Sequence, residues 1–419
     1  MAEPFVGRAG RVARDLSLLF GVDVGGAAFR ADPYRFYARA LEAGPVHRLP
    51  GGTVTVLGHR AATRVLRDPR FGHGATALHE KTLVGLPARS FMQLDAPGHT
   101  RLRRRVAPRF SVHRVAALEA PLRRHVGDLV DGCAGRDTDF VAGFAEPLAM
   151  TVISEVLGVP PRDRERFRDD ARLVVRGLDE AAHKVPDPAI ARARYRFVRY
   201  FQKLALLRRR EPGDDLVSLL AGEGGAATGE LVTTCGLLLS AGYETIVDLL
   251  GSTVWELARA PEPSGWRLAE HPDAVEAVVE EALRMYPPVQ CTLRGTLADV
   301  EIAGLAVPAG TVVCVVLAAA NRDPAVHADP HAFRPERHLR PTMARGLSPS
   351  PPHLAFGGGP HFCLGAALAR LEARTALTAL APCRPELTGD SWAYKENLMV
   401  RGLDTLPVRW RSPARTGPV

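Results

Sequence analysis

The chain has 419 residues, of which 46% are hydrophobic and 24% charged, and its formal net charge at pH 7 is +8. This composition is ordinary for a globular protein, and a chain of this length can bury a large core and enclose a cofactor. No apolar run reaches the roughly 20 residues that span a bilayer, and no like-charge run is interleaved with aromatics, so we expect a cytoplasmic protein that binds neither membrane nor nucleic acid.

The N-terminal quarter predicts a helix followed by a hairpin. We expect residues 1–30 to form an N-terminal extension. Asp32-Pro33 supplies a cap and a first-turn proline, and Gly44-Pro45 ends the helix that they begin. Residues 46–56 are strand-like on both sides of a Pro-Gly-Gly turn, which predicts a β-hairpin.

The middle of the chain predicts a series of helices, interrupted by loops, from Ala61 to about residue 286. Residues 72–90 lack strong periodicity and predict a loop. Residues 222–229 are rich in glycine and alanine and precede a long apolar helix at about 230–259.

The last third mixes β segments with one helix. Strand-like runs occupy residues 292–302 and 311–317, and residues 321–353 are rich in proline, arginine and aspartate and predict irregular structure. A helix follows at about 363–380, and then a β segment that ends near Trp410. The chain contains no internal repeat or long linker. We therefore expect a single domain over residues 1–419, mainly α with a small β-rich portion.

The six cysteines are widely spaced and include no C-x-x-C pair, which argues against a zinc ribbon or a disulfide framework. Five of them look like ordinary small buried residues. These five are Cys133, Cys235, Cys291, Cys314 and Cys383. The sixth, Cys363, lies in a sequence context of its own.

Residues 356–365 read F-G-G-G-P-H-F-C-L-G and match the pattern F-G-x-G-x-H-x-C-x-G at all six specified positions. Glycines let a backbone approach a flat macrocycle closely and adopt positive φ. Since the predicted helix begins at Cys363, its free N–H groups and its dipole can face the sulfur. A thiolate bound to a metal ion needs such stabilisation of its charge.

This loop resembles the haem-binding signature of the cytochrome P450 family. The resemblance implies that Cys363 is the axial ligand of the iron of haem b. It also implies the family's triangular, mainly helical fold, with the haem between the long central helix and the cysteine-loop helix. The haem contacts that it implies within the loop are Phe356, Gly357, His361, Cys363 and Gly365.

The segment Ala241-Gly242-Tyr243-Glu244-Thr245 lies inside the predicted long helix and resembles the family's oxygen-activating motif. Gly242 is costly inside a helix unless the backbone must approach a neighbour. Thr245 can hydrogen-bond to a preceding carbonyl and bend the helix. By resemblance, Ala241 and Gly242 border the haem, Thr245 steers protons during oxygen activation, and Glu244 helps to supply them.

Glu281 and Arg284 form an E-x-x-R pair whose spacing places both side chains on one face of a helix. Downstream, Arg337 ends a segment that resembles the family's F-x-P-E-R sequence. By resemblance these three residues form a structural ion network beneath the cysteine loop. The family's segment often continues with an aromatic residue, whereas His338 stands here, so we expect the local packing to differ.

A further segment, D-A-P-G-H-T-R-L-R at residues 95–103, resembles a conserved stretch of the bacterial members. His99 and Arg103 are four residues apart and share a helical face, which suits binding of a carboxylate. The resemblance implies that both residues bind the haem propionates, together with Arg294 and His361. A solvated charge is the alternative for each.

The candidate substrate pocket is drawn from segments that the resemblance places around the haem. Its residues are Phe91, Leu238, Val289, Thr292 and Met399. We expect a monooxygenase that hydroxylates or epoxidises a small natural product of secondary metabolism, either free or tethered to a carrier protein. Its electrons would come from NAD(P)H through a separate donor of the ferredoxin or flavodoxin type.

Three alternatives remain open from the sequence. The first keeps the haem–thiolate site but uses it for oxidative coupling or cyclisation. The second is a catalytically silent partner of a glycosyltransferase, although such relatives typically lose the cysteine loop that this chain retains. The third is a haem sensor, for which no signalling domain is visible.

Overall fold

The computed structural model describes residues 5–73, 88–176, 187–260, 264–339 and 351–411. Most of the predicted loop at 72–90 lies outside the described residues. The N-terminal part contains α1 (Phe5–Phe20), α2 (Ala27–Ala31), α3 (Tyr34–Glu42) and α4 (His59–Arg67). The middle contains η2 (Phe91–Gln93), α5 (Gly98–Val106), η3 (Ala107–Phe110), α6 (Val112–Ala117), α7 (Glu119–Cys133), η4 (Val141–Ala145), α8 (Glu146–Leu157), η5 (Pro161–Asp163), α9 (Arg164–Arg176), α10 (Pro188–Arg210) and α11 (Leu216–Ala221). Then come α12 (Thr228–Arg259), α13 (Ser264–Glu270), α14 (Pro272–Met285), α15 (Leu317–Ala320), η7 (Pro335–His338), η8 (Gly359–His361) and α16 (Ala366–Leu380).

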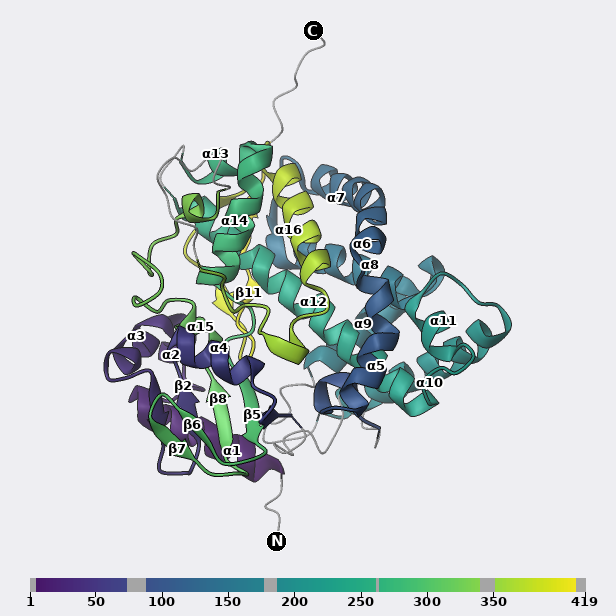
Figure 1. Cartoon of the computed structure of the whole chain (residues 1–419). Helices are drawn as coiled ribbons and strands as arrows, with labels where there is room; N and C mark the ends of the chain where they lie inside the picture. Colours follow the sequence, from purple (N-terminus) through teal and green to yellow (C-terminus); the bar gives the residue numbers. More distant parts are fainter. Residues whose placement is uncertain (1–4, 74–87, 177–186, 261–263, 340–350, 412–419) are drawn as a thin grey trace.

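The predicted long helix is confirmed as α12, which runs through the middle of the molecule with α14 and α16 beside it (Figure 1). At its N-terminus the carboxylate of Glu230 accepts a hydrogen bond from the Ala227 backbone N–H at 3.3 Å, as in a capping box. The helix is long and apolar enough to cross a membrane, but 83% of its most apolar window is buried inside the protein. It is therefore the core helix around which the other helices pack.

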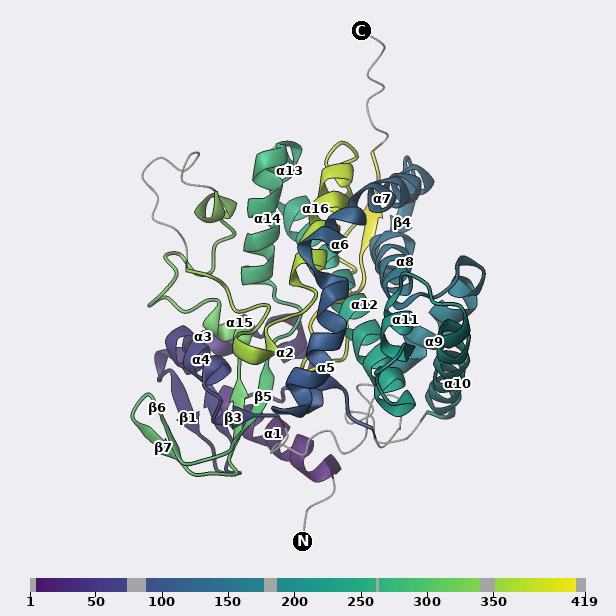
Figure 2. The same ribbon diagram turned by 45° about the vertical axis from the view of Figure 1, so that its right-hand side comes forward.

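The largest hydrophobic core is built on α12, α8, α14 and α16. On the far side of α8, the helices α9 and α10 pack against each other, and Figure 2 shows them at the edge opposite the sheet. Phe167 and Phe197 stack across this contact with ring centroids 5.9 Å apart. Aromatic pairs at this separation add to the stability that area burial provides.

The main sheet has five strands in the order β1-β2-β8-β5-β3. They are β1 (Val46–Arg48), β2 (Val54–Val56), β3 (Phe71–Gly72), β5 (Thr292–Thr296) and β8 (Val312–Val315). The predicted hairpin is confirmed, because β1 and β2 pair antiparallel with Val46 opposite Val56. Strand β2 then runs parallel to β8, which brings the beginning and the last third of the chain into one sheet.

The strand-like run at 292–302 is split into β5 and β6 (Val300–Ile302), and β6 pairs with β7 (Leu305–Val307). The run at 311–317 is shorter than predicted, since Leu317 already begins α15. The C-terminal β segment is confirmed. It comprises β9 (Glu386–Leu387), β10 (Ala393–Tyr394), β11 (Leu403–Thr405) and β12 (Pro407–Arg409), and β12 also pairs with β4 (Asp137–Asp139). The overall architecture, mainly α with a small β-rich portion, is as predicted.

Residues 5–30 pack against the sheet end of the molecule. Leu16 and Phe20 of α1 are buried, and the ring of Phe20 lies 5.7 Å from that of Phe29 and 5.3 Å from that of Tyr37. The carboxylate of Asp15 accepts hydrogen bonds from the turn of the first hairpin, at 2.8 Å from Gly51 N. Helix α1 is thus bonded to the hairpin as well as packed on it.

Candidate active site

A large cavity lies between α12 and the cysteine loop, which we define as residues 356–365. It encloses about 1450 Å³ of space free of protein atoms, counting the solvent at its mouth. Its walls come from segments far apart in the sequence, including α5, α8, α12, β5 and the start of α16. Most of its lining is apolar, with a few polar groups such as Arg103, Arg294 and His361, as is common in small-molecule sites.

Four of the five residues predicted for the substrate pocket line this cavity: Phe91, Leu238, Val289 and Thr292. Met399 is not among the lining residues. Its sulfur lies 3.3 Å from Cys291 Sγ, and its carbonyl accepts a hydrogen bond from Gln290 N at 2.8 Å. The backbone pairing between this segment and residues 289–290 turns the Met399 side chain toward the core on the sheet side, which explains the difference from the prediction.

Cys363 differs from the other five cysteines, which are buried as predicted, because it is exposed. Its exposed surface belongs to the cavity wall. The loop around it is closed by a hydrogen bond from Cys363 N to the Phe356 carbonyl at 2.9 Å. Gly359 has φ +64, and a Cβ there would lie 2.3 Å from the carbonyl oxygen of Leu66, so the loop requires glycine at this position.

The helix predicted to begin at Cys363 begins at Ala366 instead. The intervening residues bend so that the backbone N–H of Gly365 donates to the Cys363 sulfur. Burial raises the pKa of the Cys363 thiol, whereas this N–H and the charges of Arg103 and Arg370 act in the opposite direction. A metal ion bound at the sulfur would remove the proton outright.

Three histidines gather at the edge of the cavity. The ring of His361 lies 4.2 Å from that of His73 and 4.2 Å from that of His99, measured between centroids. His73 and His361 line the cavity, and His99 contacts this wall through His361. Burial, followed by the neighbouring charges of His99 and Arg294, lowers the pKa of His361 to about 3. His361 is therefore neutral at pH 7 in the protein alone.

Arg103 and Arg294 line the cavity beside these histidines. The guanidinium of Arg294 is 4% exposed and donates to Thr292 Oγ1 at 2.8 Å and to the Leu293 carbonyl at 2.9 Å. Burial lowers the pKa of Arg294 to about 10, against a weaker opposing effect of Asp95. A buried cation in this situation gains from an anionic ligand.

The same wall presents an unsatisfied nitrogen. Within the described part of the chain, Nε2 of His99 is buried and has no hydrogen-bond partner. This arrangement suits a flat macrocycle with two carboxylates and a metal at its centre. The two arginines and a histidine donor can bind the carboxylates, and the exposed thiol can bind the metal. The residues present thus fit haem, with Cys363 toward the iron and His99, Arg103, Arg294 and His361 toward the propionates.

The α12 motif contributes to the same cavity as Cys363. Ala241, Gly242 and Thr245 line the cavity. A Cβ on Gly242 would lie 2.7 Å from Cδ1 of Ile153, so a larger residue there would displace the end of the Ile153 side chain of α8. The hydroxyl of Thr245 donates to the Ala241 carbonyl at 2.7 Å, the back-bond expected from the sequence.

Glu244 is placed differently from Thr245. It is buried, at 8% exposure, and it is not among the residues that line the cavity. Its Oε1 lies 3.8 Å from Nζ of Lys395, which comes from the C-terminal β region. The acid of the motif therefore lies on a different face of α12 from the hydroxyl, next to a lysine that the sequence analysis did not single out.

The structure brings Glu281, Arg284 and Arg337 together. Arg284 donates to both carboxylate oxygens of Glu281 at 2.8 Å, and Arg337 Nε donates to Oε1 at 3.0 Å. His338, where the family often has an aromatic residue, joins them, with its Nε2 2.9 Å from Glu281 Oε2. The guanidinium of Arg284 also donates to three backbone carbonyls between residues 321 and 332. The network thereby fixes the irregular segment that leads toward the cysteine loop.

A second network, which the sequence analysis missed, begins at the neighbouring residue Glu280. Arg370 of α16 donates to its carboxylate at 2.6 and 2.9 Å, and His353 Nε2 lies 3.1 Å away. The guanidinium of Arg370 also lies 4.6 Å from the ring centre of Phe356, within the cysteine loop. The sequence showed only the E-x-x-R spacing of Glu281 and Arg284. Nothing in it indicated that Glu280 binds Arg370, which contacts the cysteine loop.

These two glutamates predict acid sensitivity. Burial alone would raise the pKa of each carboxyl, but hydrogen bonds from Arg284 and His338 to Glu281, and from Arg370 and His353 to Glu280, outweigh it and lower both values to about 2. Their contribution to stability is therefore present above about pH 5 and lost as the pH falls toward about 2. We expect the urea midpoint to fall over this range, and less steeply in Glu280→Gln. An identical pH dependence in Glu280→Gln and in the exposed control Glu223→Gln would contradict this assignment.

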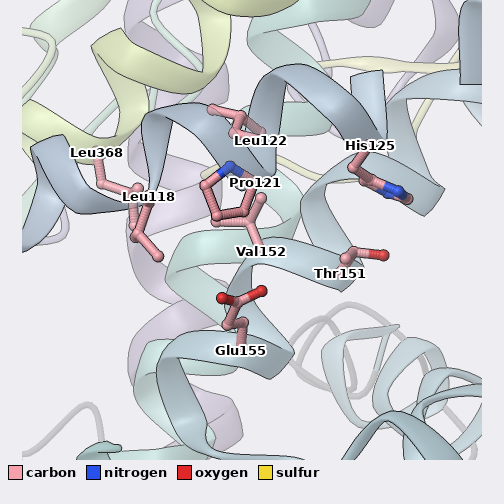
Figure 3. A pocket seen from close by; sticks show the side chains of 8 residues that line it. All are labelled: Leu118, Pro121, Leu122, His125, Thr151, Val152, Glu155 and Leu368. Atoms are coloured by element: carbon pink, nitrogen blue, oxygen red, sulfur yellow. The ribbon is translucent and has the colours of Figure 1, made fainter. Parts of the chain in front are cut away.

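A second hollow lies between α7, α8 and α16 and is shown in Figure 3. It encloses about 340 Å³ of space free of protein atoms, and its lining includes His125, Thr151 and Glu155. This hollow is much smaller than the main cavity and contains none of the predicted site residues. The main cavity is therefore the candidate active site.

Comparisons with known proteins agree with this geometry. A family model described as Cytochrome P450 matches residues 269–381. The chain is 37% identical to the cytochrome P450 monooxygenase PikC of Streptomyces venezuelae, with 94% of each chain covered. It is 33% identical to 6-deoxyerythronolide B hydroxylase of Saccharopolyspora erythraea, over 92% of this chain and 98% of that protein. The solved structure of P450BioI, in complex with an acyl carrier protein ligated with hexadec-9Z-enoic acid, has a TM-score of 0.80 and 30% identity, over 92% of this chain and 100% of that chain.

Proposed function

Because the chain belongs to the cytochrome P450 family, and is a monooxygenase whose cofactor is haem b, we propose that it inserts one atom of dioxygen into a bulky natural product of secondary metabolism. The observation that carries this proposal is that Cys363 and Thr245, which are 118 residues apart in the sequence, line the same large cavity. When bound, haem uses two electrons and two protons to reduce one oxygen atom of dioxygen to water, and transfers the other to the substrate.

The chain's own residues have separate roles in this proposal. Cys363 supplies the sulfur ligand, and the Gly365 N–H that donates to the sulfur tunes it. Arg103, Arg294 and His361 hold the propionates at the cavity wall, with His99 beside them. Thr245 presents its hydroxyl at the cavity wall, and Glu244 would help to supply protons from the face of α12 that Lys395 contacts.

The relatives support a bulky substrate, and the apolar part of the cavity wall suits one. One relative is a hydroxylase of 6-deoxyerythronolide B, as its name states, and a solved neighbour was captured with an acyl carrier protein. Part of the chain's cavity wall consists of apolar side chains such as Phe91, Leu238 and Val289. The proposal therefore includes both free and carrier-tethered substrates of polyketide or fatty-acyl type.

Electrons would arrive from NAD(P)H through a separate ferredoxin or flavodoxin-type donor in the cytoplasm. Arg104 of α5 is exposed close to the cysteine loop, where Arg103 donates to the Phe362 carbonyl at 2.5 Å. An acidic donor suits a surface that exposes arginine.

The test is turnover under ¹⁸O₂ with NADPH, a ferredoxin and its reductase, and 6-deoxyerythronolide B and free and carrier-bound hexadecenoic acid as probes. We expect a shifted haem spectrum with at least one probe and a product that contains one ¹⁸O atom. A coupled or cyclised product without ¹⁸O would contradict the proposal and favour oxidative coupling. If NADPH is consumed but no probe shifts the haem spectrum and no probe yields an oxygenated product, the proposed substrate class is contradicted.

A further inference from the structure

Three sulfur atoms from distant parts of the chain meet in the core between the main sheet and the N-terminal helices. Cys291 directly precedes β5, Cys314 lies on β8, and Met399 lies between β10 and β11. The Cys291 thiol donates to Met399 Sδ at 3.3 Å, and Cys314 shares a side-chain hydrogen bond with Cys291. The two cysteines are 4% and 0% exposed, whereas Met399 is half-buried. We call these three residues the sulfur cluster.

The sulfur cluster lies on the reverse face of the strand that forms part of the cavity wall. Thr292 and Arg294 of β5 line the cavity. Because side chains alternate between the two faces of a strand, Cys291 and Leu293 point instead into the core around the N-terminal helices. Cys314 lies opposite Leu293 in the antiparallel pairing of β5 with β8, so it shares that face. The sulfur cluster is therefore separate from the candidate active site.

The chemistry of these side chains favours a soft metal ion. Thiolate and thioether ligands select Cu(I), whereas structural zinc sites take four ligands, mostly from cysteine and histidine. Among the described residues, no three side chains of histidine, cysteine, aspartate or glutamate are grouped so that they could hold a metal ion. A third ligand beside the two thiols is therefore a thioether, which Met399 supplies.

The geometry of the cluster needs only a small adjustment to hold one ion. Three sulfurs around one ion at about 2.3 Å, the usual metal–thiolate distance, are about 4 Å apart. The 3.3 Å between the Cys291 and Met399 sulfurs therefore has to widen slightly. Methionine has three rotatable bonds and adapts readily, while the Met399 backbone stays fixed by the hydrogen bond from Gln290 N to its carbonyl at 2.8 Å.

The charge of two thiolates and one Cu(I) is partly offset by a neighbouring guanidinium. Their sum is one negative charge, which is costly to bury without a cation nearby. Arg401 supplies one, and it is held in place by donating to the Ala31 carbonyl at 3.1 Å. Its charge acts on the buried phenol of Tyr37, on which both cysteines also act, so these groups face one another. The hydrogen bond with Cys291, followed by burial, raises the pKa of the Cys314 thiol, so this thiol is protonated at pH 7 until an ion binds.

From this arrangement we propose that Cys291, Cys314 and Met399 form a binding site for one Cu(I) ion, separate from the haem site. The two thiols each lose a proton to solvent as they bind the ion, which is usual for thiolate ligands. The thioether binds without losing a proton, and the copper keeps its oxidation state. This inference does not depend on the proposed monooxygenase function.

The first experiment is an anaerobic titration of the purified protein with Cu(I) in competition with a coloured Cu(I) chelator. We expect the unaltered protein to bind one ion that neither Cys291→Ala nor Cys314→Ala binds. Met399→Leu keeps the side-chain volume and should weaken binding by about tenfold or more, since even partners outside the ligand shell change metal affinity by that factor. Cys235→Ala alters an equally buried cysteine of α12 and should bind Cu(I) as the unaltered protein does.

The second measurement needs no variant, so it stands even where an alanine variant does not fold. X-ray absorption at the copper edge of the unaltered protein should show Cu(I) with sulfur neighbours alone, at about 2.3 Å. Nitrogen neighbours would place the ion at histidines instead and overturn the inference. An unaltered protein that competes no better for Cu(I) than the double variant Cys291→Ala with Cys314→Ala would overturn it as well.

Discussion

Replacing Glu281 with glutamine should lower the free energy of unfolding by about 3–5 kcal/mol, which is enough to unfold many proteins. Glu281 and Arg284 are both fully buried, and the glutamate accepts two hydrogen bonds from Arg284 and one from the Arg334 backbone N–H at 2.7 Å. Without the carboxylate charge, the guanidinium of Arg284 remains buried with only neutral partners. Removing one member of a buried ion pair destabilises a protein by more than the intact pair stabilises it, because the remaining charge stays buried without its partner.

The measurement is the urea midpoint, followed by tryptophan fluorescence, of Glu281→Gln beside Glu223→Gln, which alters an exposed glutamate. The control should unfold within error of the unaltered protein. We also expect the Glu281 variant to retain little haem, because the network fixes the segment that leads to the cysteine loop. A Glu281→Gln protein with an unchanged midpoint and full haem content would show that the network has no structural role.

Replacing Cys363 with alanine should abolish monooxygenation while the fold survives. Cys363 is exposed, lines the cavity and is not part of the hydrophobic core, so its replacement leaves the core packing intact. The sulfur ligand is what favours O–O cleavage, so its loss should reduce turnover by a factor on the order of a thousand or more. Propionate contacts to Arg103 and Arg294 would still retain part of the haem.

The matched control is Cys383→Ala, which alters a buried cysteine in the turn after α16 whose thiol has a pKa raised by burial. Substrate oxidation and haem content are measured for both variants. We expect normal turnover in Cys383→Ala and none in Cys363→Ala. Comparable oxidation by the two variants would sink the assignment of Cys363 as ligand.

Most of the site residues that the sequence predicted belong to short motifs of contiguous residues. The cysteine loop, the α12 motif and the E-x-x-R pair each lie within ten residues, so their side chains are placed relative to one another by local geometry alone. The long helix was visible because its apolar residues are buried on nearly every face. Helix propensity was a poorer guide to where α16 begins. The Gly365 N–H donates to the Cys363 sulfur, and the helix begins only at Ala366.

Contacts between distant segments could not be predicted from one sequence. Lys395 meets Asp248 across 147 residues, and Arg370 meets Glu280 across 90, through pairings of helices and strands that no local pattern encodes. His73 reaches His361 only because β3 joins the edge of the main sheet. Met399 was misplaced for the same reason, since a backbone pairing with a remote segment decides which way its side chain points.

The most direct test of the central claim is the difference spectrum of the purified, dithionite-reduced protein with and without carbon monoxide. A thiolate ligand predicts a strongly red-shifted Soret band, present in the unaltered protein and in Cys383→Ala and absent in Cys363→Ala. A band at the position of histidine-ligated haem in the unaltered protein, or a red-shifted band that persists in Cys363→Ala, would contradict the account of the site.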